Sequence, residues 1–72
     1  HHQLRLDAAL KVCAEPQTAA EVIPSLFSRK IGVFEFGFAI GETLAHLNYL
    51  VDNGSLTRRR DEDDIIRYRR VA

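Results

Sequence analysis

The segment FGFAIGETLAHLNYLVDNG, residues 36–54, has the longest helical periodicity in the chain. Its apolar residues recur at i, i+4, i+7 and i+11, which places them on one stripe of a 3.6-residue helix. The stripe consists of Ile40, Leu44, Leu47 and Val51, widened by Phe36 and Leu50. Gly54 ends the helix, because glycine just past the last periodic residue adopts the left-handed conformation that closes a C-terminus. The sequence therefore predicts a long helix that buries this stripe.

The residues that follow Gly54 predict a β-hairpin. Residues 55–60 and 65–71 are two short β-prone segments, and the four acidic residues 61–64 form a connector of hairpin length. Alternation along the strands turns Leu56 inward on the first strand, with Ile66 and Tyr68 as the inward row of the second. A long helix that leads directly into such a hairpin is the C-terminal half of a winged helix.

Two shorter helices are predicted before the long one. Residues 1–15 form the first, and its apolar face consists of Leu6, Ala9, Leu10 and Cys13. Thr18 and Glu21 form a capping box, so the second helix begins at Ala19 and ends near Phe27. Residues 28–34 connect it to the long helix, and a short extended segment around Gln17 is a candidate third strand. The predicted fold class is α+β: a winged helix with three helices followed by a two-stranded hairpin wing, in one domain spanning residues 1–72.

Two further patterns leave alternatives open. Gly37 and Gly41 inside the long helix indicate either close approach of another backbone or a frayed first turn. His1 and His2 are either native residues or the remains of a purification tag. The chain contains no methionine, which indicates a fragment of a longer protein.

Composition restricts the class of protein. The net charge is zero, but residues 55–72 hold six arginines against four acidic residues, and residues 1–54 hold four cations against six. A domain that binds nucleic acid non-specifically is usually more basic overall. No apolar run reaches the length of a membrane span and no signal peptide is present. We therefore expect a cytoplasmic protein, in which the lone Cys13 is a buried, unreactive thiol.

No catalytic or metal-binding residue is predicted. Structural zinc sites need paired ligands such as CxxC or HxxxH, whereas Cys13 and His46 stand alone. Nucleophilic catalysis needs a hydroxyl beside a base, and the candidate serines have no neighbouring base: Ser25, Ser28 and Ser55.

The side of the long helix opposite its stripe is the candidate interaction surface. Its residues are Phe38, Glu42, Ala45, His46, Tyr49 and Asp52, with no Lys or Arg among them. A recognition helix must approach phosphates and read bases with cations or amides, so DNA binding is not expected. The acidic hairpin tip also opposes it, with Arg58, Arg59 and Arg60 interpreted as partners of the acids at 61–64.

The predicted partner contact uses Phe38, Glu42, Ala45 and Tyr49. These residues form an apolar strip bordered by acids, as surfaces that contact another protein do. The alternative is that Phe38 folds back under the connector at residues 31–34 and belongs to the core.

Three segments resemble a known family: TAAEVIPSLF, FAIGETLAHLNYLVDNGSL and the arginine-rich hairpin ending IRYRR. Together they resemble the small winged-helix domain at the C-terminus of many metallo-β-lactamase-fold hydrolases. A helix that begins near a His-His or His-Arg pair with a downstream arginine leads out of the catalytic domain in that family. His1, His2 and Arg5 are similar, which favours native histidines.

The resemblance implies a parent enzyme with two zinc ions in an αβ/βα sandwich, bound by an HxHxDH motif and further upstream residues. That motif is absent from these residues, so no catalytic or zinc-binding role transfers to any position here. The expected function is a non-catalytic C-terminal module that packs on the upstream catalytic domain, or on a second copy in a homo-oligomer, and shapes the substrate entrance. The alternative is a stand-alone nucleic-acid-binding winged helix of a transcription regulator.

Overall fold

The structure is a computed structural model that describes residues 2–71. In chain order the elements are α1 (His2–Val12), α2 (Ala19–Leu26), the short 3-10 helix η1 (Val33–Glu35), α3 (Phe36–Asp52), β1 (Leu56–Arg60) and β2 (Ile66–Arg70). The prediction of three α-helices followed by a two-stranded antiparallel sheet is confirmed. The interpretation of the N-terminal histidine pair as native falls outside the side chains that the structure describes.

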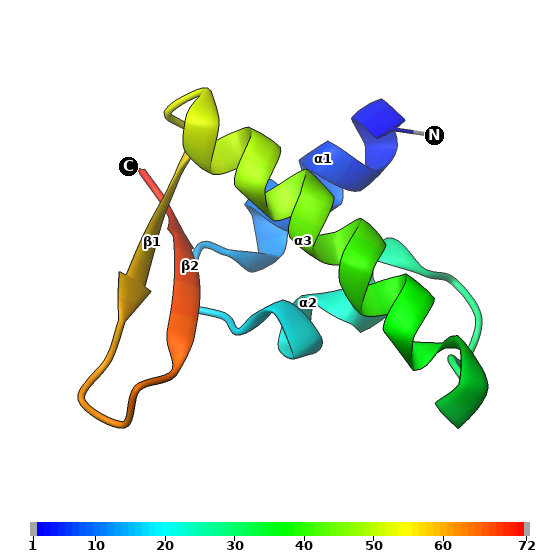
Figure 1. The fold of residues 1–72 in the computed structure, drawn as a ribbon. Helices are drawn as coiled ribbons and strands as arrows, with labels where there is room; N and C mark the ends of the chain where they lie inside the picture. Colours follow the sequence, from blue (N-terminus) through cyan, green and yellow to red (C-terminus); the bar gives the residue numbers. More distant parts are fainter. Residues whose placement is uncertain (1, 72) are drawn as a thin grey trace.

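The three α-helices pack against one another, with α3 lying across the other two, and the hairpin lies at the edge of this helical layer (Figure 1). In Figure 1, α3 crosses in front of α1 and α2, and the β1–β2 hairpin lies beside them. The apolar core joins all of these elements. Its buried members are Ala9, Cys13, Val22, Leu26, Leu47, Leu50, Leu56 and Tyr68.

The start of α2 follows from the capping box. The Glu21 backbone N–H donates to Thr18 Oγ1 (3.1 Å), and the Thr18 N–H donates to Glu21 Oε1 (2.8 Å). The two side chains satisfy amides that the first helical turn leaves without partners. The predicted start of this helix is therefore confirmed.

The end of α3 sets the direction of the hairpin. The Gly54 N–H donates to the Val51 carbonyl (3.1 Å) and the Ser55 N–H donates to the Leu50 carbonyl (2.8 Å). Gly54 has a φ of 86°, so these two bonds form a Schellman motif with glycine at its left-handed position. The motif closes the helix and sends the chain into β1.

The buried side of α3 differs from the predicted stripe. Its buried residues are Ala39, Thr43, His46, Leu47 and Leu50. Ile40, Leu44 and Val51 are only half-buried, and 47% of Phe36 is exposed. The stripe is rotated because the helix turns small residues, Ala39 and Thr43, toward the interior, where the large Ile40 and Leu44 were expected. Small side chains give little hydrophobic signal, so the sequence pattern missed this rotation.

The glycines of α3 do not mark a close contact. A Cβ added at Gly37 or Gly41 would meet no heavy atom outside the local backbone within 4 Å. The suggestion that another backbone approaches the helix at these positions is therefore wrong.

The hairpin register runs from Leu56 opposite Arg70 to Arg60 opposite Ile66. Leu56 and Tyr68 are buried as expected, whereas Ile66 is 39% exposed although it belongs to the predicted inward row. Ile66 lies near the tip of the hairpin, away from the base where Leu56 and Tyr68 join the core.

Gln17 pairs with the outer edge of β2, as the sequence suggested. The Gln17 N–H donates to the Tyr68 carbonyl (2.9 Å), and the Tyr68 N–H donates to the Gln17 carbonyl (2.7 Å). The segment between α1 and α2 thus fastens the second strand to the helices.

Candidate interaction surface

The four predicted contact residues lie on one side of α3. Phe38, Glu42, Ala45 and Tyr49 are spaced at i, i+4, i+7 and i+11, which spreads them over about 16 Å of helix. Phe38 is 70% exposed and Tyr49 is 57% exposed. The alternative in which Phe38 folds back into the core is therefore wrong.

This row flanks the buried side of α3 and is not opposite to it. Because the core stripe is rotated, Phe38 and Tyr49 lie about 110° around the helix from the mean direction of the buried side chains.

The same rotation buries His46, which was predicted on the outer surface but is only 6% exposed. Its Nδ1 lies 2.7 Å from the Glu42 carbonyl oxygen, and since a carbonyl only accepts, Nδ1 carries the proton and donates.

A shallow hollow of about 450 Å³ lies between this flank and α1. Its lining residues are Leu6, Glu42, Ala45, His46 and Tyr49. The structure thus brings three of the four predicted residues together around one concavity. Phe38 does not line it and lies one helical turn beyond Glu42.

Sequence reasoning missed an adjoining group of exposed apolar residues at the start of α3. Val33 is 82% exposed, Phe34 is 98% exposed and Phe36 is 47% exposed. The connector that carries them is fixed by an ion pair between Arg29 and Glu35, and by the Gly32 N–H, which donates to Glu35 Oε1 (3.2 Å). The hydrogen bond from Arg29, followed by that from Gly32, lowers the pKa of Glu35. The signal that could have revealed this group is three phenylalanines within five residues, 34–38, without a helical period.

The side of α3 shared by the four predicted residues therefore carries two exposed aromatic side chains, Phe38 and Tyr49, which we call the aromatic flank. Phe36 lies about 160° around the helix from Phe38 and lines a different hollow, against α2. Large exposed apolar patches on a folded domain mark contacts with other molecules more often than single exposed side chains do.

The residues described here do not fit a metal centre. Among residues 2–71, no three His, Cys, Asp or Glu side chains are grouped so that they could hold a metal ion. Cys13 is fully buried, and burial raises the pKa of its thiol to about 11, so it is a poor nucleophile at neutral pH. No helix in the described part of the chain is long and apolar enough to cross a membrane.

The hairpin arginines pair differently from the prediction. Of Arg58, Arg59 and Arg60, only Arg60 meets an acid of the tip, with Asp64 at 3.2 Å. Arg58 donates instead to Asn48 of α3 (2.7 Å). The second tip pair comes from the other strand, where Arg67 Nε lies 3.0 Å from Asp61. The expected pairing fails because alternate residues of β1 project to opposite sides of the ribbon.

Comparisons with known proteins agree with the resemblance seen in the sequence. The family model for the metallo-beta-lactamase-like, C-terminal domain matches residues 6–71. The crystal structure of a beta-lactamase domain protein from Burkholderia ambifaria superposes with a TM-score of 0.91 at 41% sequence identity. The alignment covers 99% of this chain and 22% of that chain, so this chain spans about a fifth of the length of its relative. A search of curated proteins gives no match. The chain belongs to the metallo-beta-lactamase-like C-terminal domain family.

Proposed function

We propose that this chain is the non-catalytic, C-terminal winged-helix module of a metal-dependent hydrolase of the metallo-β-lactamase class. In this role it packs on the catalytic domain, or on a second subunit, and shapes the substrate entrance. The observation that carries the proposal is the aromatic flank, exposed on a domain whose family is defined by a C-terminal position. The proposal includes a cytoplasmic location, in keeping with a chain whose one cysteine is a buried free thiol.

The winged-helix assignment has support from the order and packing of the elements. Three helices precede a hairpin that leaves α3 directly, and a one-residue bridge at Gln17 adds pairing at the outer edge of β2. The base of the hairpin is part of the core through Leu56 and Tyr68, while its tip extends away from the helices. This arrangement supports the winged-helix assignment.

The chemistry of the aromatic flank favours a protein partner. Phenylalanine and tyrosine supply large apolar contact areas and are enriched at the energetic centres of interfaces. Glu42 beside Tyr49 gives the flank a polar border, as interface rims have. No Lys or Arg occurs in α3, so an anionic partner is disfavoured on this side.

Zinc enters the proposal only through the parent enzyme. The residues described here offer no group of ligands for it, so the two-zinc site implied by the family resemblance would have to be built by residues upstream of this domain. An HxHxDH motif in the coding sequence before His1 is the expected finding. Its absence there would remove the hydrolase assignment while leaving the interface assignment open to direct measurement.

The interface is tested by association. We expect Phe38→Ala and Tyr49→Ala to weaken binding of this chain to the separately produced upstream domain by at least about tenfold, as truncation of buried aromatic anchors does. Ile65→Ala is the matched control, because Ile65 is a 40% exposed apolar residue on the hairpin. It should change the affinity by less than about twofold. The proposal is contradicted if all three variants weaken binding equally, or if no variant weakens binding.

The rival function, a stand-alone nucleic-acid-binding winged helix, has one observation in its favour. The outward side of the hairpin carries arginines that lack acidic partners among the described residues. The helix that would read the bases, however, presents no cation, and the tip that would ride along the backbone is acidic at residues 61–64. Titration of the chain with a short oligothymidylate separates the two functions.

A further inference from the structure

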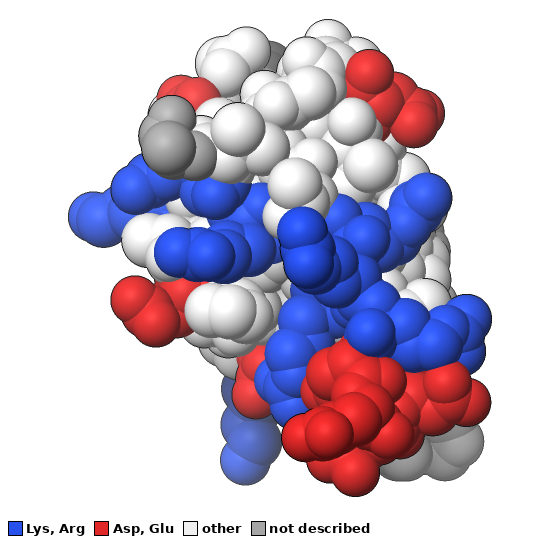
Figure 2. All heavy atoms as spheres, turned by 90° about the vertical axis from the view of Figure 1, so that its left-hand side faces the viewer, with Lys and Arg blue, Asp and Glu red and all other residues white. Residues whose placement is uncertain are grey.

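The hairpin holds six of the ten Lys and Arg residues of the chain, and three of the six lie on its outward side. Figure 2 shows Lys and Arg side chains in a nearly continuous band over this side, with acidic side chains gathered at one end. Alternation along the strands explains the band: Leu56 and Tyr68 point into the core, so Arg59, Arg67 and Arg69 point outward. The gathered acids include the tip residues 61–64.

The arginines on the outward side of the hairpin lie close enough on neighbouring strands to repel one another. Arg59 and Arg67 are directly opposite each other in the strand register. Like charges at such positions destabilise a sheet. Arg67 is compensated by Asp61 (3.0 Å) and Glu21 (3.6 Å). Arg59 and Arg69 have no acidic partner within 4.0 Å among residues 2–71. Two guanidinium groups thus remain uncompensated beside a third.

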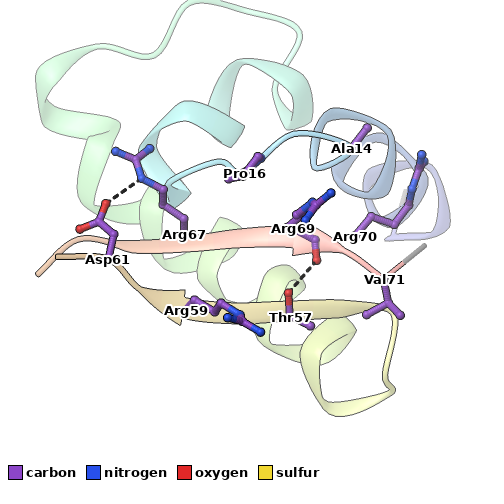
Figure 3. A pocket seen from close by; sticks show the side chains of 9 residues that line it. All are labelled: Ala14, Pro16, Thr57, Arg59, Asp61, Arg67, Arg69, Arg70 and Val71. Atoms are coloured by element: carbon purple, nitrogen blue, oxygen red, sulfur yellow. Dashed lines mark hydrogen bonds and ion pairs between the residues drawn. The ribbon is translucent and has the colours of Figure 1, made fainter. Parts of the chain in front are cut away.

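These side chains surround a hollow of about 630 Å³, drawn in Figure 3. Its charged lining comes from Arg59, Arg67, Arg69, Arg70 and Asp61, and its apolar lining from Ala14, Pro16 and Val71. Sites for small ligands have volumes of about 300–1,000 Å³. This hollow shares no residue with the one beside the aromatic flank, so the two are separate features of the surface.

We propose that this hollow, which we call the arginine hollow, is a binding site for a phosphate-bearing small molecule. A carboxylate presents two oxygens and one charge, which a single guanidinium satisfies through a bidentate pair. A phosphate group carries about two negative charges and three acceptor oxygens, which matches two guanidiniums. Arg59 and Arg69 bind the phosphate. Arg70 also lines the hollow, and its Nη1 donates to the Leu10 carbonyl (3.4 Å). The apolar lining contacts the remainder of the ligand.

Single-stranded nucleic acid fits the arginine hollow less well. Proteins that bind single strands stack successive bases on aromatic side chains. The lining of this hollow contains no Phe, Tyr or Trp, and the exposed aromatic residues of the chain lie in η1 and α3. The acids at the hairpin tip would also repel a polyanion that continued along the ribbon.

The test is a titration of the 15N-labelled chain with inorganic pyrophosphate at constant ionic strength, following the arginine Nε–H resonances by NMR. We expect saturable shifts at Arg59 and Arg69 and none at Arg5, which stacks over the Phe27 ring. Arg59→Gln and Arg69→Gln should each weaken pyrophosphate binding by about tenfold, a loss typical of one charge-assisted hydrogen-bond pair. Lys30→Gln removes one charge from an exposed connector position and should change binding by less than about twofold.

Three results would overturn the proposal. Equal shifts at all arginines would indicate general counter-ion binding, and insensitivity to Arg59→Gln would remove the site. Saturable binding of a short oligothymidylate to the same residues, without pyrophosphate binding, would favour the nucleic-acid function instead. Circular dichroism of each variant checks that the fold is kept, and the unmodified chain gives the shift pattern independently of any variant.

Discussion

The helical layer and the hairpin are stabilised in different ways. Six of the eight buried core residues belong to the helical part, and only Leu56 and Tyr68 come from the strands. Three of the four ion pairs among residues 2–71, in contrast, lie on the hairpin or join it to α2. Buried apolar area dominates folding energy, whereas exposed ion pairs contribute about 0–1 kcal/mol each. Stability is therefore expected to reside in the helices and to fall toward the hairpin tip.

The exposed surfaces of the two regions differ as well. The helical region exposes phenylalanines, from Phe34 to Phe38, and α3 carries no Lys or Arg. The hairpin exposes arginines and carries two large exposed aliphatic residues, Ile65 and Ile66, near its tip. A partner with an apolar surface suits the first region, and an anionic ligand suits the second. One small domain thus has room for two contacts of unrelated chemistry.

The largest effect is expected at the centre of the helical layer. Leu47 is completely buried, so Leu47→Ala should lower the free energy of unfolding by about 2–5 kcal/mol through lost burial and a residual cavity. Phe38→Ala on the same helix removes a larger but exposed side chain and should cost less than about 1 kcal/mol. Thermal and denaturant melts of the two variants measure the difference. Equal destabilisation would show that Phe38 contributes to the core.

An intermediate effect is expected where the two regions join. Gly54 has a φ of 86° and open space around its Cβ position, so Gly54→Ala meets only the conformational cost of left-handed backbone, about 1–2 kcal/mol. Gly41→Ala is the matched control, since it adds the same methyl group in open space within a helix. It should raise stability by up to about 1 kcal/mol. If both variants lower stability, the cause is steric crowding of the added methyl group and not the left-handed backbone conformation.

The parts of the fold that the sequence predicts are those with local causes. The capping box of Thr18 and Glu21 and the left-handed Gly54 each depend on a few neighbouring residues, and each is confirmed. The alternation that buries Leu56 and Tyr68 is local in the same sense, and so is the acidic connector between the strands.

The parts that the sequence did not predict depend on contacts between elements. The buried side of α3 is decided by the approach of α1, α2 and β1, which places Thr43 inside although its hydroxyl finds no hydrogen-bond partner among the described residues. The exposure of Phe34 follows from a connector held by Arg29 and Glu35, six residues apart. The arginine hollow could be predicted only with the strand register known, because the register decides which arginines face α3 and which face solvent. No local pattern contains this information.

The smallest effect is expected at the hairpin tip, where Asp61 organises the connector. Its carboxylate accepts from the Ile65 N–H (3.0 Å), the Asp63 N–H (2.9 Å) and Arg67 Nε (3.0 Å). The hydrogen bond from Ile65, followed by that from Arg67, lowers the pKa of Asp61 below its usual value. Asp64 next to them adopts a φ of 67°, a left-handed conformation that aspartate tolerates better than most residues.

Acid should therefore loosen the tip before it affects the helical layer. Because the folded-state pKa of Asp61 is lowered, its stabilisation is fully present above the unfolded value of about 3.9 and is lost as pH falls through the folded-state pKa. Carboxyl 13C NMR should show Asp61 titrating below about pH 3.9. Amide exchange at Asp63 and Ile65 should be faster when the Asp61 carboxyl is protonated.

Asp61→Asn should give that fast exchange already at neutral pH, because the neutral amide accepts these bonds more weakly. Asp63→Asn, which removes one charge but keeps the Asp63 N–H bond to Asp61, should leave it slow. If Asp61 titrates at or above 3.9, or if acid unfolds α3 together with the tip, then the hairpin is not the independently organised region that its contacts indicate.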